Sequence, residues 1–146
     1  MSENGPVDSP ARVQARKHLD RSGLLYQKNM LQDSEIAIRE AIAADPSFGP
    51  AYSSLGAVLK SQGRLVEAEN AYRLAIIMDP NYGLAYSQLG SLLQEQSHLL
   101  EAEGCFRKAI TIFPKARNNY YELAEVLERL NRLDEARNML AKASEL

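Results

Sequence analysis

Hydrophobic residues between positions 49 and 82 recur three and four residues apart, in two blocks separated by a short polar stretch. The recurring residues are Leu55, Val58 and Leu59 in the first block, and Leu65, Ala68, Tyr72, Ala75 and Ile76 in the second. An apolar stripe of this period is typical of an amphipathic α-helix. The segment therefore predicts two helices, joined by a tight turn, that pack antiparallel with their apolar stripes facing each other.

The same pattern occurs again 34 residues later. Ala51 to Tyr82 reads AYSSLGAVLKSQGRLVEAENAYRLAIIMDPNY, and Ala85 to Ala116 reads AYSQLGSLLQEQSHLLEAEGCFRKAITIFPKA. Repetition at one fixed period predicts a solenoid, because each unit is too small to bury its own apolar face and stacks on its neighbours. Two further copies in phase give four units, at residues 15–48, 49–82, 83–116 and 117–146.

Eight helices are expected from the stripes and from the residues that end helices. Their predicted ranges are Pro10–Lys28, Leu31–Ala44, Pro50–Gln62, Leu65–Met78, Gly83–Gln96, Leu99–Ile112, Arg117–Leu130 and Leu133–Ser144. The two helices of each unit are separated by Asn29, Gly63, Ser97 or Asn131. Glycine and asparagine suit the left-handed conformation of such a turn, whereas Ser97 should be slightly strained. Residues 1–9 are expected to form a flexible tail before one domain at 10–146.

The positions shared by the two central units resemble the tetratricopeptide repeat pattern W-x2-L-G-x2-Y, A-x3-F and P. The matching residues are Tyr52, Leu55, Gly56, Leu59, Ala68, Tyr72, Ala75 and Pro80, then Tyr86, Leu89, Gly90, Leu93, Ala102, Phe106, Ala109 and Pro114. The resemblance to the tetratricopeptide repeat family implies an all-α fold, a right-handed α-solenoid of helix-turn-helix repeats. It also implies a protein that binds other proteins.

Composition and charge narrow the class of partner. The net charge of −2 gives no general attraction to nucleic acid or to an anionic membrane. The single cysteine excludes an internal disulfide, and no stretch approaches the roughly 20 apolar residues of a membrane span. The first residues lack the features of a secretory signal, so we expect a cytoplasmic protein.

No catalytic arrangement is visible in the sequence. The chain has two histidines: His18 stands where other units carry a packing tyrosine, and His98 lies in a turn between helices. Cys105 lies inside a helix beside Phe106, as a packing thiol would. There is no glycine-rich phosphate loop and no metal-ligand spacing. We therefore expect a protein that is not an enzyme and that needs no cofactor and no metal.

The family resemblance places the partner-binding residues on the first helix of each unit, which lines the concave face. The candidate residues are Tyr26, Ser53, Ala57, Lys60, Ser87, Gln88, Ser91, Gln94, Tyr121, Glu122, Glu125 and Glu128. The centre of this face is small and neutral, and its far end is acidic with one aromatic ring. Carboxylates beside an aromatic ring can hold Lys or Arg, so the partner is expected to be basic where it meets the fourth unit.

Two specialisations of the family leave no trace at these positions. The Lys, Asn and Arg residues that clamp a terminal carboxylate in chaperone-binding members are replaced, for example by Ser53, Ala57 and Gln88. The central repeats resemble the arms of O-linked N-acetylglucosamine transferases. However, the asparagine ladder of those arms is absent, because Asp20, Ser54, Gln88 and Glu122 stand at its positions.

The leading hypothesis is a scaffold or adaptor that binds a peptide segment of a partner protein in its concave groove. The alternative is a substrate-presenting arm or regulatory subunit of an enzyme whose catalytic part is elsewhere. Binding of nucleic acid is disfavoured by the acidic end of the groove.

Two outer surfaces add to this picture. The first helix carries Arg12, Arg16, Lys17, Arg21 and Lys28, which form either a solvated outer face or a small basic patch. At the other end no helix follows residue 144 to cover the last apolar positions. These are Leu140 and Leu146, beside Ser144 where other units have isoleucine. This edge is expected to pair with a second copy or with a further C-terminal part.

Overall fold

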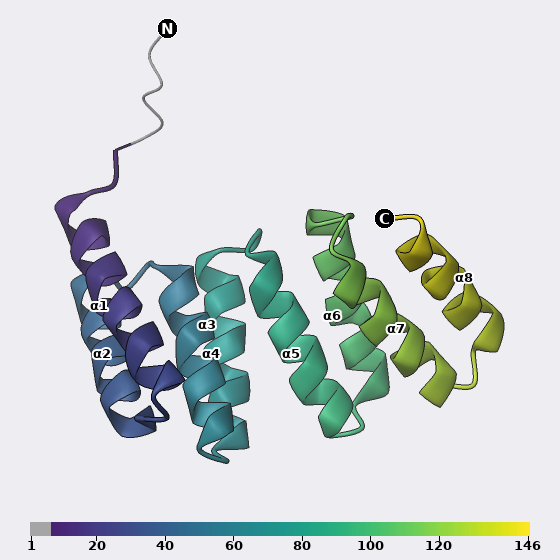
Figure 1. Cartoon of the computed structure of the whole chain (residues 1–146), viewed down its shortest axis with the longest axis horizontal. Helices are drawn as coiled ribbons and strands as arrows, with labels where there is room; N and C mark the ends of the chain where they lie inside the picture. The colour runs from purple at the N-terminus through teal and green to yellow at the C-terminus, as the bar shows by residue number, and fades with distance from the viewer. Residues whose placement is uncertain (1–6) are drawn as a thin grey trace, which may run out of the picture. The chain divides into compact units, whose positions relative to one another are not determined.

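The computed structural model describes residues 7–146, and every regular element in that range is an α-helix (Figure 1). The helices are α1 (Pro10–Gln27), α2 (Leu31–Ala44), α3 (Gly49–Ser61), α4 (Leu65–Met78), α5 (Gly83–Glu95), α6 (Leu99–Ile112), α7 (Arg117–Arg129) and α8 (Leu133–Ser144). The second helix of every pair is confirmed at both ends. The first helices end one residue earlier than predicted, and α3 also begins one residue earlier.

The turn inside each helical pair has the predicted left-handed residue. The φ angles are 59° at Asn29, 77° at Gly63, 62° at Ser97 and 59° at Asn131. A side chain with Cβ is disfavoured in this region by about 1–2 kcal/mol relative to glycine, and asparagine tolerates it better than serine. Ser97 is therefore the most strained of the four turn residues, as predicted from the sequence.

The four repeats group into two larger compact units, Met1–Met78 and Asp79–Leu146, which are called the first and the second unit from here on. The first contains the pairs α1–α2 and α3–α4, and the second contains α5–α6 and α7–α8. Residues 1–6 of the predicted tail lie outside the described residues. Nε of Arg16 donates to Oδ2 of Asp8 at 2.6 Å. Oγ of Ser9 accepts a hydrogen bond from the backbone amide of Arg12 at 3.2 Å, and this contact caps α1. The single domain at 10–146 stays a prediction.

Small residues let the two helices of a pair approach closely. In the first unit, a Cβ on Gly56 would lie 2.5 Å from the ring of Tyr72, and in the second a Cβ on Gly90 would lie 3.0 Å from Phe106. Both rings are buried, at 2% and 0% exposure. Glycine is thus required at this point because an aromatic ring from the facing helix fills the space of its side chain.

A tyrosine hydroxyl ties three of the first helices to the loop before them. Tyr52 donates to the carbonyl of Pro46 at 2.7 Å, and Tyr86 and Tyr120 donate to the equivalent proline carbonyls at 3.0 and 2.7 Å. His18 occupies this position in α1, where its Nδ1 lies 3.0 Å from Glu40 of α2. It therefore replaces the tyrosine with a polar contact to its own helical pair.

An arginine–glutamate pair joins successive repeats inside each unit. Arg64 lies 2.9 Å from Glu35 of α2, and Arg132 lies 2.6 Å from Glu103 of α6. Burial alone would raise the pKa of Glu35, but hydrogen bonds from Arg39 and Gln62 and the charge of Arg64 lower that pKa overall. Each pair therefore holds the end of one first helix against the second helix of the repeat before it.

The last helix is less covered than its counterparts. Leu140 is 39% exposed, although the residues at the same position in α4 and α6, Tyr72 and Phe106, are buried. Ser144 and Leu146 are also exposed. Self-association through this edge stays a prediction.

None of the helices described over residues 7–146 combines the length and the apolar character needed to cross a bilayer.

Candidate functional site

The predicted binding residues all lie on the first helices of their pairs. In the first unit these are Tyr26 on α1 and Ser53, Ala57 and Lys60 on α3. In the second unit they are Ser87, Gln88, Ser91 and Gln94 on α5 and Tyr121, Glu122, Glu125 and Glu128 on α7.

In the second unit, α5 and α7 are held side by side by polar contacts at both ends. Ser87 donates through Oγ to Oδ1 of Asn119 at 2.7 Å. At the other end, Arg129 donates to the carbonyl of Gln94 at 2.9 Å and to Oγ of Ser97 at 3.0 Å. The Arg129 side chain is therefore engaged with α5, so its charge is held at the edge of the α7 face.

The exposed face of α7 is acidic and aromatic. Tyr121 is 46% exposed, and Glu125 and Glu128 are exposed at four and seven residues further along the same helix. This spacing puts the three side chains on one face. Within residues 7–146, neither Glu125 nor Glu128 forms an ion pair, whereas half-buried Glu122 makes a further interaction.

The hydroxyl groups on α5 already donate their hydrogen bonds. Ser87 donates to Asn119, and Ser91 donates to the carbonyl of Ser87 at 3.1 Å. A serine hydroxyl has one proton to donate and two lone pairs that accept. The remaining capacity of these side chains, like that of the carboxylates on α7, is to accept hydrogen bonds.

The corresponding face of the first unit combines one exposed tyrosine with small residues. The hydroxyl of Tyr26, which is 41% exposed, lies 2.7 Å from Oγ of Ser61 and so links α1 to α3. A Cβ on Gly23 would meet nothing within 4 Å. Ala57 and Lys60 are half-buried, and Lys60 makes a further interaction.

Two of the predicted residues offer almost no surface. Ser53 is 1% exposed and Gln94 is 6% exposed. Oε1 of Gln94 is buried without a hydrogen-bond partner in the described part of the chain, which is uncommon for a buried polar atom. A partner could reach either side chain only after movement of its surroundings.

The sequence was compared with models of known protein families. The tetratricopeptide repeat model matches residues 19–83 and 87–144. The chain belongs to the tetratricopeptide repeat family. Tetratricopeptide repeats generally form non-catalytic scaffolds, and the chain is a module of protein–protein interaction. A search of curated proteins found no significant match.

Solved tetratricopeptide structures share the fold at low sequence identity. A crystal structure of MamA matches with a TM-score of 0.82 at 22% identity, over 90% of this chain and 77% of that chain. PilF of Pseudomonas aeruginosa matches with a TM-score of 0.86 at 20% identity, over 92% of this chain and 62% of PilF. The first tetratricopeptide domain of Spaghetti (RPAP3), bound to the HSP90 peptide SRMEEVD, matches with a TM-score of 0.77 at 17% identity. The match covers 82% of this chain and 95% of that domain.

Two residues outside the predicted binding set hold α5 and α7 together in the second unit, and sequence reasoning missed one of them, Asn119. Asn119 is 7% exposed and accepts from Ser87, and Arg129 holds the far ends of α5 and α7 together. The signal for Asn119 was a polar residue at the position where the two central repeats have alanine, Ala51 and Ala85.

The groups that could carry chemistry are separate in the structure. His98 is exposed at the start of α6, and Cys105 is half-buried within the same helix. Among residues 7–146, no three His, Cys, Asp or Glu side chains are grouped so that they could hold a metal ion.

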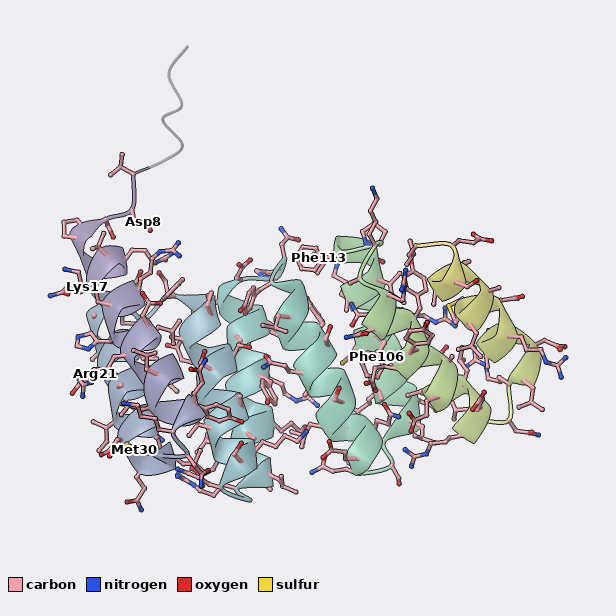
Figure 2. The ribbon with its side chains drawn as sticks, viewed as in Figure 1. Asp8, Lys17, Arg21, Met30, Phe106 and Phe113 are labelled. Atoms are coloured by element: carbon pink, nitrogen blue, oxygen red, sulfur yellow. The ribbon has the colours of Figure 1, made fainter. Side chains whose placement is uncertain are left out.

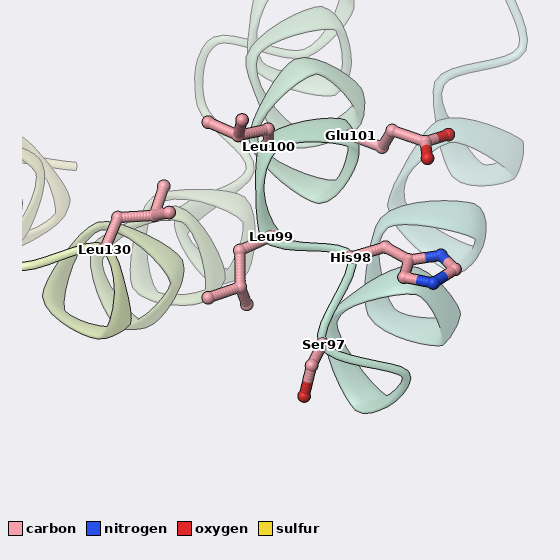
Figure 3. Close-up of a pocket in the computed structure, with 6 residues that line it drawn as sticks. All are labelled: Ser97, His98, Leu99, Leu100, Glu101 and Leu130. Atoms are coloured by element: carbon pink, nitrogen blue, oxygen red, sulfur yellow. The ribbon is translucent and has the colours of Figure 1, made fainter.

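A pocket of about 350 Å³ lies at the turn between α5 and α6, near the end of α7. Leu99, Leu100 and Leu130 line it, while Figure 3 shows the side chains of His98 and Glu101 pointing away from Leu130. Small-molecule sites combine apolar walls with a few convergent polar groups. This pocket lacks that convergence, and none of the predicted binding residues lines it.

Proposed function

We propose that the chain is an interaction scaffold that binds a peptide segment of a partner protein in its concave groove, with a basic part of the segment on α7. The observation that carries this proposal is the exposed face of Tyr121, Glu125 and Glu128, whose two carboxylates form no ion pair within residues 7–146. Two unpaired carboxylates beside an accessible ring favour a cation.

The hydrogen-bonding character of α5 supports the same partner. The hydroxyl groups of Ser87 and Ser91 donate their protons to acceptors on α7 and α5, so they can only accept hydrogen bonds from a partner. A segment rich in donors, such as Lys or Arg side chains and free backbone amides, matches acceptors on both helices. Each exposed ionic or cation–π contact contributes about 0.5–1 kcal/mol, so the charges supply specificity and speed of encounter more than affinity.

The acidic peptide bound by the RPAP3 domain is a poor fit to this face. The printed sequence SRMEEVD ends in three acids among four residues. Like charges on α7 would repel them, and the clamp positions of this chain carry small or neutral residues such as Ser53, Ala57 and Gln88.

The test uses a charge reversal on α7. Affinity capture from the native cell with the parent chain identifies bound proteins, and peptides from them are then titrated by fluorescence anisotropy. Glu125→Lys/Glu128→Lys should weaken the genuine peptide about tenfold at low salt, and the difference should shrink as salt is raised. Glu122 is left unchanged because it makes a further interaction.

The matched control is Asp134→Lys/Glu145→Lys, which makes the same change in net charge at two exposed residues outside α7. It should leave the affinity within twofold of the parent. Equal weakening by both variants, or tighter binding of SRMEEVD than of the basic peptide, would remove the α7 face from the proposal.

A further inference from the structure

The outer face of α1 carries a row of exposed residues with a clear counterpart in the other first helices. The row consists of Lys17, Arg21, Leu24 and Lys28. Figure 2 shows Lys17 and Arg21 pointing outward from α1, on the side opposite to α3 and α4. One repeat later in the sequence, 34 residues on, the same positions are Ala51, Leu55, Val58 and Gln62 of α3.

In α3 these positions are covered by α2. Ala51 belongs to one buried cluster with Ala41 near the end of α2, and Gln62 donates to Glu35 near its start at 3.1 Å. Leu55 and Val58, between them, are 7% and 2% exposed. The preceding helix therefore lies antiparallel along this row, from one end to the other.

The second unit repeats the arrangement. The corresponding residues of α7 include Asn119, Leu123 and Val126, which are 7%, 0% and 0% exposed, and α6 packs against α7. The row is thus the surface on which a first helix receives a second helix from the repeat before it.

On α1 the row is open and basic. Leu24 is 61% exposed, the Arg21 side chain is 56% exposed, and Lys17 and Lys28 are exposed. Two acids lie beside the row: exposed Asp20, three residues after Lys17 on α1, and Glu40 of α2, which lies 3.4 Å from Arg21 and also binds His18. Within residues 7–146, Lys17 and Lys28 form no ion pair.

We propose that this row docks an acidic amphipathic helix of a partner protein, antiparallel to α1, in the place that α2 takes on α3. Its acidic residues meet Lys28 near its first turn and Lys17 near its last turn, and an apolar residue between them covers Leu24. Glu35 at Gln62 and Ala41 at Ala51 give this register.

A helix fits these observations better than a polyanion. The row is one helix wide, and the exposed leucine at its centre needs an apolar contact that phosphate groups do not give. The net charge of −2 opposes general attraction to nucleic acid or an anionic membrane. The proposal concerns a different surface from the α7 face and is independent of it.

The probe is a synthetic peptide of residues 31–44, the sequence of α2, carrying Ala41→Glu. It is titrated into the ¹⁵N-labelled full chain and followed by amide chemical shifts. The expected result is saturable binding with shifts concentrated on α1. Lys17→Glu/Lys28→Glu should weaken binding about tenfold, from loss of two exposed ion pairs and new repulsion. Leu24→Ser should weaken it about threefold or more by loss of apolar contact.

The control variant is Lys108→Glu/Lys115→Glu, which reverses two exposed lysines of the second unit and should leave binding within twofold. A peptide with Glu35→Lys/Ala41→Lys should not bind. The proposal is overturned if the acidic peptide does not saturate, if its shifts fall on the second unit, or if the control variant weakens it equally. It is also overturned if poly(U) RNA or phosphatidylserine vesicles bind the row more tightly than the peptide and are unaffected by Leu24→Ser.

Discussion

Gly23 lies inside α1 and Gly56 inside α3, the first helices of the two pairs in the first unit, but their surroundings are opposite. A Cβ on Gly56 would lie 2.5 Å from Cε1 and 2.9 Å from Cζ of Tyr72, a residue that is only 2% exposed. A Cβ on Gly23 would meet nothing within 4 Å. The same substitution should therefore have opposite effects at the two sites.

Gly56→Ala should destabilise the chain by about 1–3 kcal/mol, because overpacking outweighs the gain of about 1 kcal/mol from the better helix former. Gly23→Ala should stabilise it by about 0.5–1 kcal/mol, because it limits the unfolded chain without a clash. Urea unfolding followed by far-ultraviolet circular dichroism measures both changes.

The fourth repeat suggests a rescue. There Ala124 and Leu140 stand at the positions of Gly56 and Tyr72, so a larger residue on the first helix accompanies a smaller one on the second. Gly56→Ala/Tyr72→Leu should be more stable than the sum of the two single changes, by about 1 kcal/mol or more. Equal unfolding midpoints for the two alanine variants, or strict additivity in the double variant, would refute this account of the glycine.

Two further predictions concern the core and the pairs between repeats. Leu89→Ala should cost about 2–5 kcal/mol because Leu89 is 2% exposed, whereas Leu84→Ala on the same helix, at a 49% exposed position, should cost under about 1 kcal/mol; similar urea midpoints would contradict the register. Glu35 and Glu103 have pKa values lowered by folding, so their contribution is complete above about pH 4.5 and is lost as the pH falls through the folded pKa. Glu35→Gln/Glu103→Gln should flatten the loss of stability between neutral and acid pH, and an unchanged slope would contradict this role.

Most of the fold can be predicted from the sequence because the same 34-residue repeat occurs several times. Asn29, Gly63 and Asn131 mark the turns, and Asp45 before a proline ends α2, as its extended φ of −143° shows. The first helices end one residue early because the next residue already belongs to the turn. Lys28, for example, still bonds helix carbonyls but immediately precedes the left-handed residue.

The sequence places the candidate binding residues only to the level of the helix. Repeat position identifies which side of α5 or α7 a residue occupies, but not the offset between neighbouring helices. That offset brings Ser87 to Asn119, two positions earlier in its own repeat, and carries Arg129 to the carbonyl of Gln94. It also decides burial, so Ser53 is covered at 1% exposure although the pattern placed it on the surface.

The distribution of charge separates structural from available groups. Glu35 and Glu103 are engaged by arginines of the following repeat, so these charges serve the stacking of helices. Glu125 and Glu128 on α7, and Lys17 and Lys28 on α1, form no ion pairs within residues 7–146. The first unit thus has two lysines without ion pairs on its basic row, and the second has two carboxylates without ion pairs on α7. Since like charges repel, a segment of the charge proposed for one surface is disfavoured at the other, so the two proposals together predict two partners of opposite charge.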